Sequence, residues 1–388
     1  MKPCLLFAPI AGGILLFSSM IAQDSPVKNA VKAVRDQFAP DRRVAVFDVQ
    51  PEQSAIGLIL RGEVDNPEAR TAVVQAVGKL GLGTVLDSIR VLPDTALGEL
   101  TYGIVVLSVG NVRSKPGEAE ELSTQVLMGS VVKVLKKPMG GYYYVQMPDK
   151  YLGWLDRAAF QLTTRSVVNA WAAARKVIVT GYFGMVREQP EAGALPLCDV
   201  VAGCVLRTSG AQGAWTAVEL ADGRKGYLES SLVEEYDTWK RTRSLTGDNI
   251  EKTAKMFLGI PYLWGGTSCK GMDCSGFVKT VYRLNGMELN RDASQQAAMG
   301  VDANPGVNFE SLQKGDLLFF GQKASAEKAE RITHVGIYLE KRQFIHSSGR
   351  VRLSSFDPSS PLYEESLLKR FVRARRVIPD AQVPEIRK

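Results

Sequence analysis

Histidine is scarce in this sequence, because His334 and His346 are the only two in 388 residues. Cysteine is also scarce, with five residues, and no two of them have the Cys-x-x-Cys spacing. A structural zinc site needs four such ligands at short spacings, so we expect neither a metal nor another cofactor. Cys198 and Cys204 flank five residues. They form either a disulfide across a tight turn or two buried free thiols.

Long runs of one charge are absent. The net charge is +7 with an isoelectric point near 9.0, and hydrophobic and charged residues make up 45% and 23% of the chain. This is ordinary globular composition, and we expect no nucleic-acid partner. The basic stretch KRFVRARR (369–376) is either the solvated face of a strand or a surface that attracts an anionic polymer such as a cell wall.

The amino terminus has the order of a secretory signal. Lys2 precedes an apolar stretch from Leu5 to Ala22, and the polar residues 23–26 follow. Residues 1–22 are therefore predicted to be a signal peptide, although Met20 stands where a small residue is usual. Because an apolar stretch of about 17–20 residues can span a bilayer, an uncleaved anchor is the alternative. We expect export to the periplasm, the cell envelope or the medium, with membrane attachment only if the signal remains.

Residues 24–100 predict a small α/β domain. Apolar residues at three- and four-residue spacing indicate a helix over 27–38, and two strands are expected over 44–49 and 56–64. Asn66-Pro67-Glu68 provides an N-cap, a proline at the first helical position and an early acid, so a second helix should reach about Gly78. A strand over 88–93 completes the unit. It resembles the BON-type domains of bacterial envelope proteins, without a motif that assigns it a role.

An internal repeat occupies the middle of the chain. The segment NVRSKP (111–116) recurs as MVREQP (185–190), and GSVV (129–132) recurs as GCVL (203–206), both 74 residues later. GWL (153–155) recurs as GYL (226–228). Short alternating strands broken by glycine and proline favour small all-β barrels. We predict two, over 104–162 and 176–236, joined by a polar helix in 163–175, and both resemble bacterial SH3-like domains.

The last part, residues 245–380, predicts an α+β domain. Helices are expected over 249–258 and 275–285, the second beginning at Cys274. Strands are expected over 316–321, 333–340, 342–348 and 370–378. Helices followed by an antiparallel sheet are typical of the α+β class.

Cys274 has the position that a nucleophilic thiol needs. A free cysteine has a pKa near ~8.5, and a helix amino terminus with a neighbouring imidazolium lowers it. Cys274 starts a helix, whereas Cys269 lies inside a glycine-rich loop and is interpreted as a bystander. His334 and His346 lie on successive predicted strands, and a short hairpin would place them side by side. A thiol, a base and a group that orients the base form a nucleophilic triad.

Five sequence blocks in order carry a family resemblance: PYLWGG (261–266), DCSGF (273–277), LQKGDL (312–317), HVGIY (334–338) and IHS (345–347). Together they resemble the NlpC-type cell-wall cysteine peptidases, which have a papain-like core. The resemblance covers about 245–380. The SH3-like pair upstream is similar to a subgroup that cleaves the γ-D-glutamyl–diamino acid bond of murein peptides.

The resemblance implies Cys274 as nucleophile, His334 as base and His346 as the residue that orients it. Arg291-Asp292 matches an Arg-Asp-Ser block whose acid binds the substrate's free amine, with Ala293 in place of the serine. The remaining substrate contacts implied are Tyr262, Trp264, Asp273, Ser275, Asp292, Glu121 and Tyr151. For the two aromatic residues near the nucleophile the alternative is a place in the core, and for Glu121 it is an exposed loop.

We therefore expect a monomeric α+β cysteine endopeptidase with a papain-like catalytic domain, two small SH3-like β-barrels and a small α/β amino-terminal domain. Its expected substrate is a murein stem peptide with a free amino-terminal L-alanine, cut before meso-diaminopimelate or lysine during cell-wall turnover. One alternative is a wall-binding protein without activity, in which the SH3-like pair does the work. Another is an amidase or acyltransferase that uses the same thiol.

Overall fold

The computed structural model describes residues 14–379, and side chains from residue 26 onward. The chain divides into two compact units between Leu97 and Gly98. The predicted signal peptide, residues 1–22, and its alternative as a membrane anchor fall mostly on residues 1–13, outside the described part. Within the described residues, no helix is long and apolar enough to cross a membrane.

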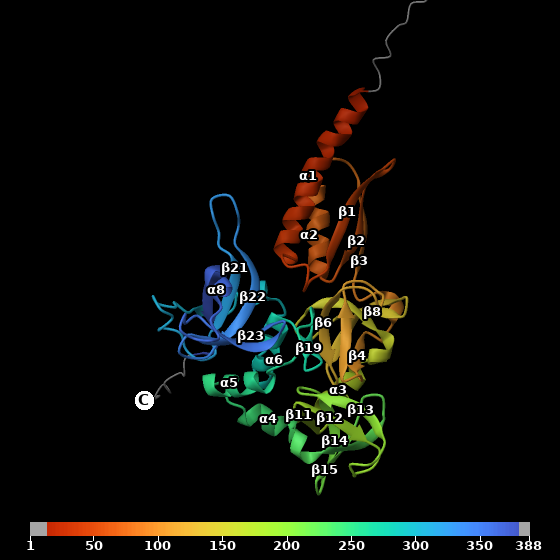
Figure 1. Cartoon of the computed structure of the whole chain (residues 1–388). Helices are drawn as coiled ribbons and strands as arrows, with labels where there is room; N and C mark the ends of the chain where they lie inside the picture. The colour runs from red at the N-terminus through yellow and green to blue at the C-terminus, as the bar shows by residue number, and fades with distance from the viewer. Residues whose placement is uncertain (1–13, 380–388) are drawn as a thin grey trace, which may run out of the picture. The chain divides into compact units, whose positions relative to one another are not determined.

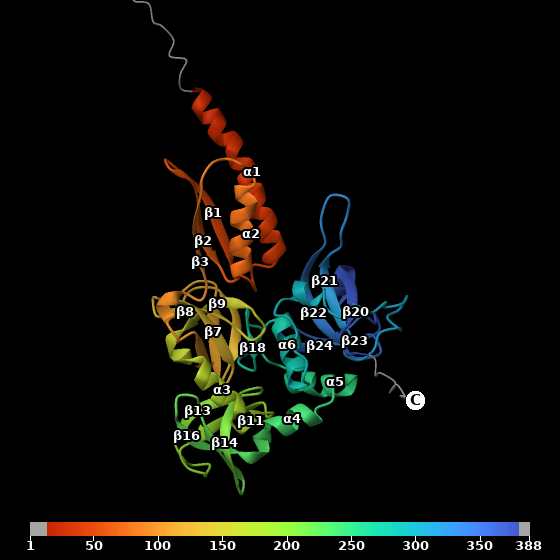
Figure 2. The same cartoon turned by 180° about the vertical axis from the view of Figure 1, so that it is seen from behind.

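The first unit is a three-stranded sheet with two helices packed against it (Figures 1 and 2). It contains α1 (Ile14–Phe38), β1 (Phe47–Ser54), β2 (Gly57–Val64), α2 (Pro67–Gly78) and β3 (Val85–Val91). The N-cap prediction is confirmed, because the side chain of Asn66 accepts a hydrogen bond from the Glu68 N–H. The predicted first helix, 27–38, is confirmed as the carboxyl-terminal part of α1, which begins earlier, at Ile14. The predicted first strand, 44–49, overlaps β1 but begins three residues before it.

Two seven-stranded antiparallel sheets form the middle of the chain. The first β-domain contains β4 (Tyr102–Val105), β5 (Val109–Arg113), β6 (Leu122–Leu127), β7 (Val131–Met139), β8 (Tyr142–Gln146), β9 (Leu152–Asp156) and β10 (Phe160–Thr163). The second β-domain contains β11 (Lys176–Val179), β12 (Phe183–Arg187), β13 (Pro196–Val201), β14 (Val205–Gln212), β15 (Trp215–Glu219), β16 (Lys225–Glu229) and β17 (Val233–Glu235).

The repeat seen in the sequence is a repeat of topology. The first sheet has the order β10-β4-β7-β8-β9-β5-β6, and the second has the equivalent order β17-β11-β14-β15-β16-β12-β13. Even a loop contact is repeated, because Arg113 Nη1 donates to the Glu120 carbonyl and Arg187 Nη1 donates to the Ala194 carbonyl, each at 2.7 Å. The two domains therefore share one fold.

The helix between the two β-domains, α3 (Arg165–Ala173), is where predicted, but it is not polar throughout. Its Trp171 is buried, and the indole N–H donates to the Gly129 carbonyl of the first β-domain at 3.2 Å. At the same carboxyl end of α3, the ammonium of Lys176 donates to the carbonyls of Trp171, Ala172 and Ala174 at 2.9, 2.8 and 2.6 Å. Lys176 thus satisfies carbonyls that the helix end leaves without partners.

The carboxyl-terminal α+β domain has a six-stranded sheet of order β20-β25-β21-β22-β23-β24. In chain order the strands are β20 (Val301–Asp302), β21 (Leu317–Gln322), β22 (Arg331–Tyr338), β23 (Gln343–Ser348), β24 (Arg350–Ser355) and β25 (Phe371–Arg376). Its helices are α5 (Gly247–Met256), α6 (Cys274–Leu284), α7 (Ala293–Gln296) and α8 (Glu365–Arg370), with the small hairpin β18 (Thr267–Ser268) and β19 (Gly271–Met272) before α6. Helix α4 (Tyr236–Thr242) precedes them and packs against β11 and β17 of the second β-domain. The elements not predicted are the helices α4, α7 and α8 and the strands β18, β19, β20 and β24.

Two expectations about charge and cysteine are corrected. The arginines of the basic stretch KRFVRARR have partners inside the domain: Arg376 pairs with the buried Asp316 at 2.8 Å, and Arg375 donates to the Met299 and Gly300 carbonyls. The stretch is therefore not a simple solvated face. Cys198 and Cys204 are free thiols, so the disulfide alternative is wrong.

Replacing Lys176 by methionine should lower the free energy of unfolding by about 2–3 kcal/mol, because three carbonyls at the end of α3 lose their donor. Urea denaturation followed by circular dichroism measures the change. Lys225→Met is the matched control, since the Lys225 side chain is 76% exposed. Equal stability of the two variants would show that water replaces the ammonium without cost.

Candidate active site

Cys274 is the first residue of α6, and Asp273 is the N-cap of that helix. The Asp273 carboxylate accepts a hydrogen bond from the Gly276 N–H at 2.7 Å through Oδ1 and from the Gly265 N–H at 2.9 Å through Oδ2. The same side chain therefore ends the glycine-rich loop and starts the helix. This geometry explains why the helix begins at the cysteine.

Cys274 is buried, with an exposure of 7% for the whole residue. The pKa of Cys274 is raised to about 11, mainly by burial and secondly by the Asp273 carboxylate, although the backbone N–H groups of Val335 and Ser275 act in the opposite direction. In the resting structure the sulfur is thus a thiol. It needs a neighbouring base to become a nucleophile.

The two histidines contact each other, as the hairpin prediction required. His334 Nε2 lies 2.8 Å from His346 Nδ1. Strands β22 and β23 pair with Ile337 opposite Ile345, which makes the histidines diagonal neighbours across the hairpin. In this register Gly336 lies opposite His346, and a Cβ there would approach the His346 Cβ to 3.2 Å. A side chain at position 336 would crowd the buried ring.

Both imidazoles are neutral at ordinary pH. Burial lowers the pKa of His334 to about 4, and the charges of Arg370 and Arg352 act in the same direction. The contact with His346 uses Nε2 of His334, so a group on the other side of the ring would meet Nδ1. The N–H of Val335, the next residue in the chain, points to the Cys274 sulfur, which places the strand of His334 beside the thiol.

A chain of polar contacts behind His346 was not predicted. His346 Nε2 lies 3.0 Å from Ser354 Oγ, which also accepts from Arg352 Nη1 at 3.1 Å. Arg352 Nη2 in turn donates to Glu364 at 2.8 Å. Ser354 can accept from an Nε2–H of His346, which would leave Nδ1 as the acceptor for His334. Both Ser354 and Arg352 belong to β24, a strand that was not predicted.

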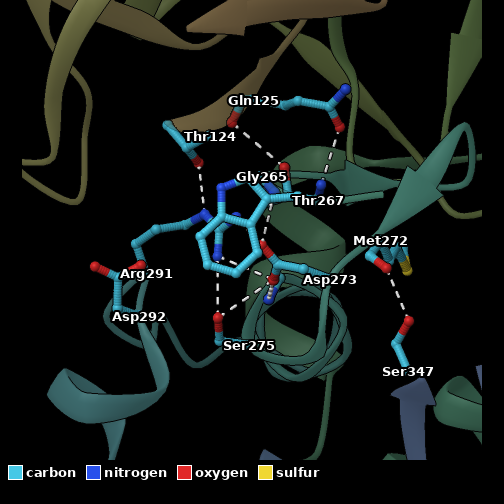
Figure 3. A network of polar contacts seen from close by, with 12 residues as sticks. Thr124, Gln125, Gly265, Thr267, Met272, Asp273, Ser275, Arg291, Asp292 and Ser347 are labelled. Atoms are coloured by element: carbon cyan, nitrogen blue, oxygen red, sulfur yellow. Dashed lines mark hydrogen bonds and ion pairs between the residues drawn. The ribbon is translucent and has the colours of Figure 1, made fainter. Parts of the chain in front are cut away.

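Asp273 and Ser275, predicted as substrate contacts, have partners within the protein (Figure 3). Arg291 binds both oxygens of Asp273, and its Nη1 also donates to Ser275 Oγ at 3.0 Å. Arg291 Nε donates to Thr124 Oγ1 of the first β-domain at 2.9 Å. The match to an Arg-Asp-Ser block included Arg291 but assigned it no role. Asp273 and Ser275 therefore bind Arg291 at the start of α6.

The first β-domain also contacts the glycine-rich loop that precedes Cys274 in the chain (Figures 2 and 3). Gln125 Oε1 accepts from the Thr267 N–H at 2.9 Å and from Ser268 Oγ at 3.0 Å. Gly265 has a φ of +80°, and a Cβ there would come within 2.2 Å of the Leu122 carbonyl. The loop thus lies directly against β6, and only glycine fits at position 265.

The remaining predicted substrate residues meet in pairs between these two domains. Tyr151 of the first β-domain donates to Asp292 Oδ2 at 3.1 Å. Conversely, Trp264 of the carboxyl-terminal domain donates to Glu121 Oε1 at 2.8 Å. Trp264 is 63% exposed, which excludes its alternative place in the core. Tyr262 is half-buried, and burial together with the nearby Cys274 raises the pKa of its phenol.

Cys269 lies in the turn between β18 and β19 and packs against the cores of the second β-domain and the carboxyl-terminal domain. Burial raises the pKa of its thiol to about 11. No cluster of three metal-ligating side chains occurs in the part of the chain that the structure describes.

The buried His346 should make the fold sensitive to acid. Burial, then His334 and Arg352, lower the pKa of His346 to about 2, whereas an unfolded histidine titrates near ~6.5. The unfolded chain therefore binds a proton below pH ~6.5 that the folded chain rejects. Stability is lost as the pH falls through this window, by about 1.4 kcal/mol per pH unit.

We predict that going from about pH 7 to about pH 5 costs the native protein about 2 kcal/mol more than it costs a His346→Gln variant. Urea denaturation at the two pH values measures both differences. Parallel losses in the two proteins would mean that His346 is protonated in the folded state.

Two family profiles match the sequence. Residues 259–376 match the NlpC/P60 family, and residues 112–160 match the bacterial dipeptidyl-peptidase Sh3 domain. A crystal structure of an NlpC/P60 family protein from Bacillus cereus is similar to this chain, with a TM-score of 0.61 and 24% sequence identity. The alignment covers 72% of this chain and 100% of the chain in the crystal structure. That likeness shows a shared fold.

Curated relatives are named as peptidases. Dipeptidyl-peptidase 6 of Lysinibacillus sphaericus is 28% identical over 272 residues, which is 68% of this chain and 95% of the relative. Gamma-D-glutamyl-L-lysine dipeptidyl-peptidase of Bacillus cereus is 35% identical over 162 residues, which is 42% of this chain and 46% of the relative. The family resemblance read from the five sequence blocks is confirmed, and the chain belongs to the NlpC/P60 family of cysteine peptidases, with a bacterial SH3-like domain before its catalytic domain.

Proposed function

We propose that this cell-wall peptidase hydrolyses the γ-D-glutamyl–L-diamino acid bond of murein stem peptides that carry a free amino-terminal L-alanine. The contact pairs Tyr151–Asp292 and Trp264–Glu121 carry the proposal, because each joins a carboxylate of one domain to an aromatic residue of the other. Two relatives named gamma-D-glutamyl-L-lysine dipeptidyl-peptidase support the choice of bond. Export is part of the proposal, since murein lies outside the cytoplasm.

In the proposed reaction, Cys274 is the nucleophile and His334 is the base. His334 Nδ1 takes the thiol proton as the sulfur attacks the γ-carbonyl of D-glutamate. The Cys274 N–H belongs to the first turn of α6, where amide groups have no partner within the helix, and it can donate to the oxyanion. His334 then gives its proton to the leaving amine of the diamino acid. Water, deprotonated by His334, hydrolyses the thioester.

His346 is proposed to hold His334 in the tautomer that can act as a base. With the proton on His334 Nε2 donated to His346 Nδ1, 2.8 Å away, His334 Nδ1 has a free lone pair. Ser354 Oγ, 3.0 Å from His346 Nε2, completes this arrangement by accepting the other proton. The neutral pair supports the proposal, because a base must be unprotonated before it acts.

Asp292 and Glu121 are proposed to bind the ammonium of the terminal L-alanine. Each charge-assisted hydrogen bond to an ammonium is worth roughly 1.5–3 kcal/mol. Tyr151, 9% exposed, closes the pocket on the side of the first β-domain. In intact murein the alanine is amide-linked, so the substrate is a freed peptide and the enzyme acts in turnover or recycling.

The alternative of a wall-binding protein without enzymatic activity is less well supported. A wall-binding relative with no activity would be expected to lose a residue of the thiol–imidazole set. Here Cys274, His334 and His346 are all present, and the two rings are in contact. An amidase or acyltransferase would use the same thiol, but it would not need two carboxylates for a free amine.

Replacing Cys274 by alanine should abolish hydrolysis of L-Ala-γ-D-Glu-diamino acid, with a loss on the order of 10⁴-fold or more, because no nucleophile remains. Cys269→Ala is the matched control and should retain the native rate. Product release followed by mass spectrometry measures both. A Cys274→Ala protein that still cleaves the peptide, with Cys269→Ala inactive but folded, would reverse the assignment.

Acetylating the terminal alanine should lower kcat/KM by at least about a hundredfold, because the peptide loses a charge bound by two carboxylates and gains bulk against Tyr151. Kinetics on the free and the acetylated tripeptide provide the comparison. The same protein with Asp292→Asn should discriminate less between them. Equal rates for the two peptides would leave the SH3-like pair as a wall-binding module and remove the amine pocket.

A further inference from the structure

Arg291 is among the largest fully buried side chains of the described residues, with an exposure of 2%. Its guanidinium binds Asp273 with two nitrogens, Ser275 Oγ with Nη1 and Thr124 Oγ1 with Nε. A buried cation is stable only when its charge and its N–H groups are matched. Asp273 supplies the charge, and the two hydroxyls accept further N–H bonds.

The partner of Arg291 is the side chain that organises the nucleophile. Asp273 accepts the Gly276 N–H inside α6 and the Gly265 N–H in the preceding loop, while its chain neighbour is Cys274. A tilt of the Asp273 carboxylate would therefore move both the loop and the first turn of the helix. Arg291 fixes that carboxylate by a bidentate contact, which specifies orientation as well as distance.

Thr124 is the contribution of the first β-domain to this network, as Figure 3 shows. It lies in β6 opposite Val112, and its hydroxyl is the partner of Arg291 Nε. The internal repeat provides a natural comparison, because Cys198 has the same register in the second β-domain, opposite Val186. The second domain thus lacks the hydroxyl at this position. The hydroxyl is present only in the first β-domain, whose strand β6 lies against the glycine-rich loop before Cys274.

We propose that Arg291 and Thr124 are positioning residues for the proposed reaction: Arg291 orients Asp273 and so the first turn of the helix that carries Cys274, and the Thr124 hydroxyl orients Arg291. The first β-domain then contributes to turnover as well as to substrate binding. This inference rests on the proposed role of Cys274 as the nucleophile. Neither residue touches the reacting atoms.

The test compares Thr124→Val with Thr124→Ser in the full-length protein. Thr124→Val has nearly the native shape but no hydroxyl, so kcat should fall about tenfold with KM unchanged, in line with one lost hydrogen bond to a charged group. Thr124→Ser keeps the hydroxyl and should restore the rate. Thr216→Val is the matched control, since Thr216 is equally buried in the second β-domain and bonds Ser230 at 2.9 Å.

Three kinetic results would overturn the inference. They are a kcat for Thr124→Val within twofold of that for Thr216→Val, a failure of Thr124→Ser to restore kcat, or a rise in KM with kcat unchanged. The last would make Thr124 a substrate-binding residue only. If Thr124 acted only through overall stability, Thr124→Val and Thr124→Ser would not differ in kcat alone.

A second readout needs no substrate. Iodoacetamide alkylation of Cys274 can be followed by mass spectrometry, because Lys270 separates Cys269 and Cys274 into different tryptic peptides. Alkylation of Cys274 should slow severalfold in Thr124→Val, with Cys269 unchanged. If the native protein cleaves no stem peptide, the proposed function fails, and this rate decides the inference. An unaltered alkylation rate in Thr124→Val would then overturn it.

Discussion

The buried ion pair between Arg291 and Asp273 is the constraint on which the active site depends. Removing one partner of a buried pair typically costs about 3–5 kcal/mol, because the other charge is left without compensation. Here the carboxylate has two further tasks, since it caps α6 and holds the Gly265 amide. The position of Cys274 therefore follows from a charge balance deep in the domain.

The catalytic domain and the first β-domain share this site. Thr124 completes the coordination of Arg291, and Gln125 binds the loop at Thr267. Near the surface, two carboxylate–aromatic contacts cross between the same two domains. Residues of the first β-domain thus contact both Arg291, which binds the N-cap of the Cys274 helix, and the proposed amine pocket. Changes in this β-domain are therefore expected to alter the specificity of the peptidase.

The sequence predicted those features whose signals are local or periodic. Asn66-Pro67 marked a helix start, the cysteine at a helix start stood out from Cys269, and alternation placed both histidines on one hairpin. Contacts between distant segments left no such signal. Thr124 meets Arg291 across 167 residues, and the burial of Asp316 against Arg376 turned a stretch that looked solvated into part of the domain. Ser354 was missed although it is close to His346 in the sequence, because the strand that carries it, β24, was not predicted.

The most direct test of the account is a double-mutant cycle on the ion pair, with the alkylation rate of Cys274 as the readout. Arg291→Met leaves the Asp273 carboxylate uncompensated beside the thiol, so alkylation should be much slower than in the native protein. Adding Asp273→Asn removes that charge and keeps a side-chain oxygen that can cap α6. The account predicts that the double variant reacts faster than Arg291→Met alone. A double variant that is slower than both single variants, by the product of their effects, would contradict it.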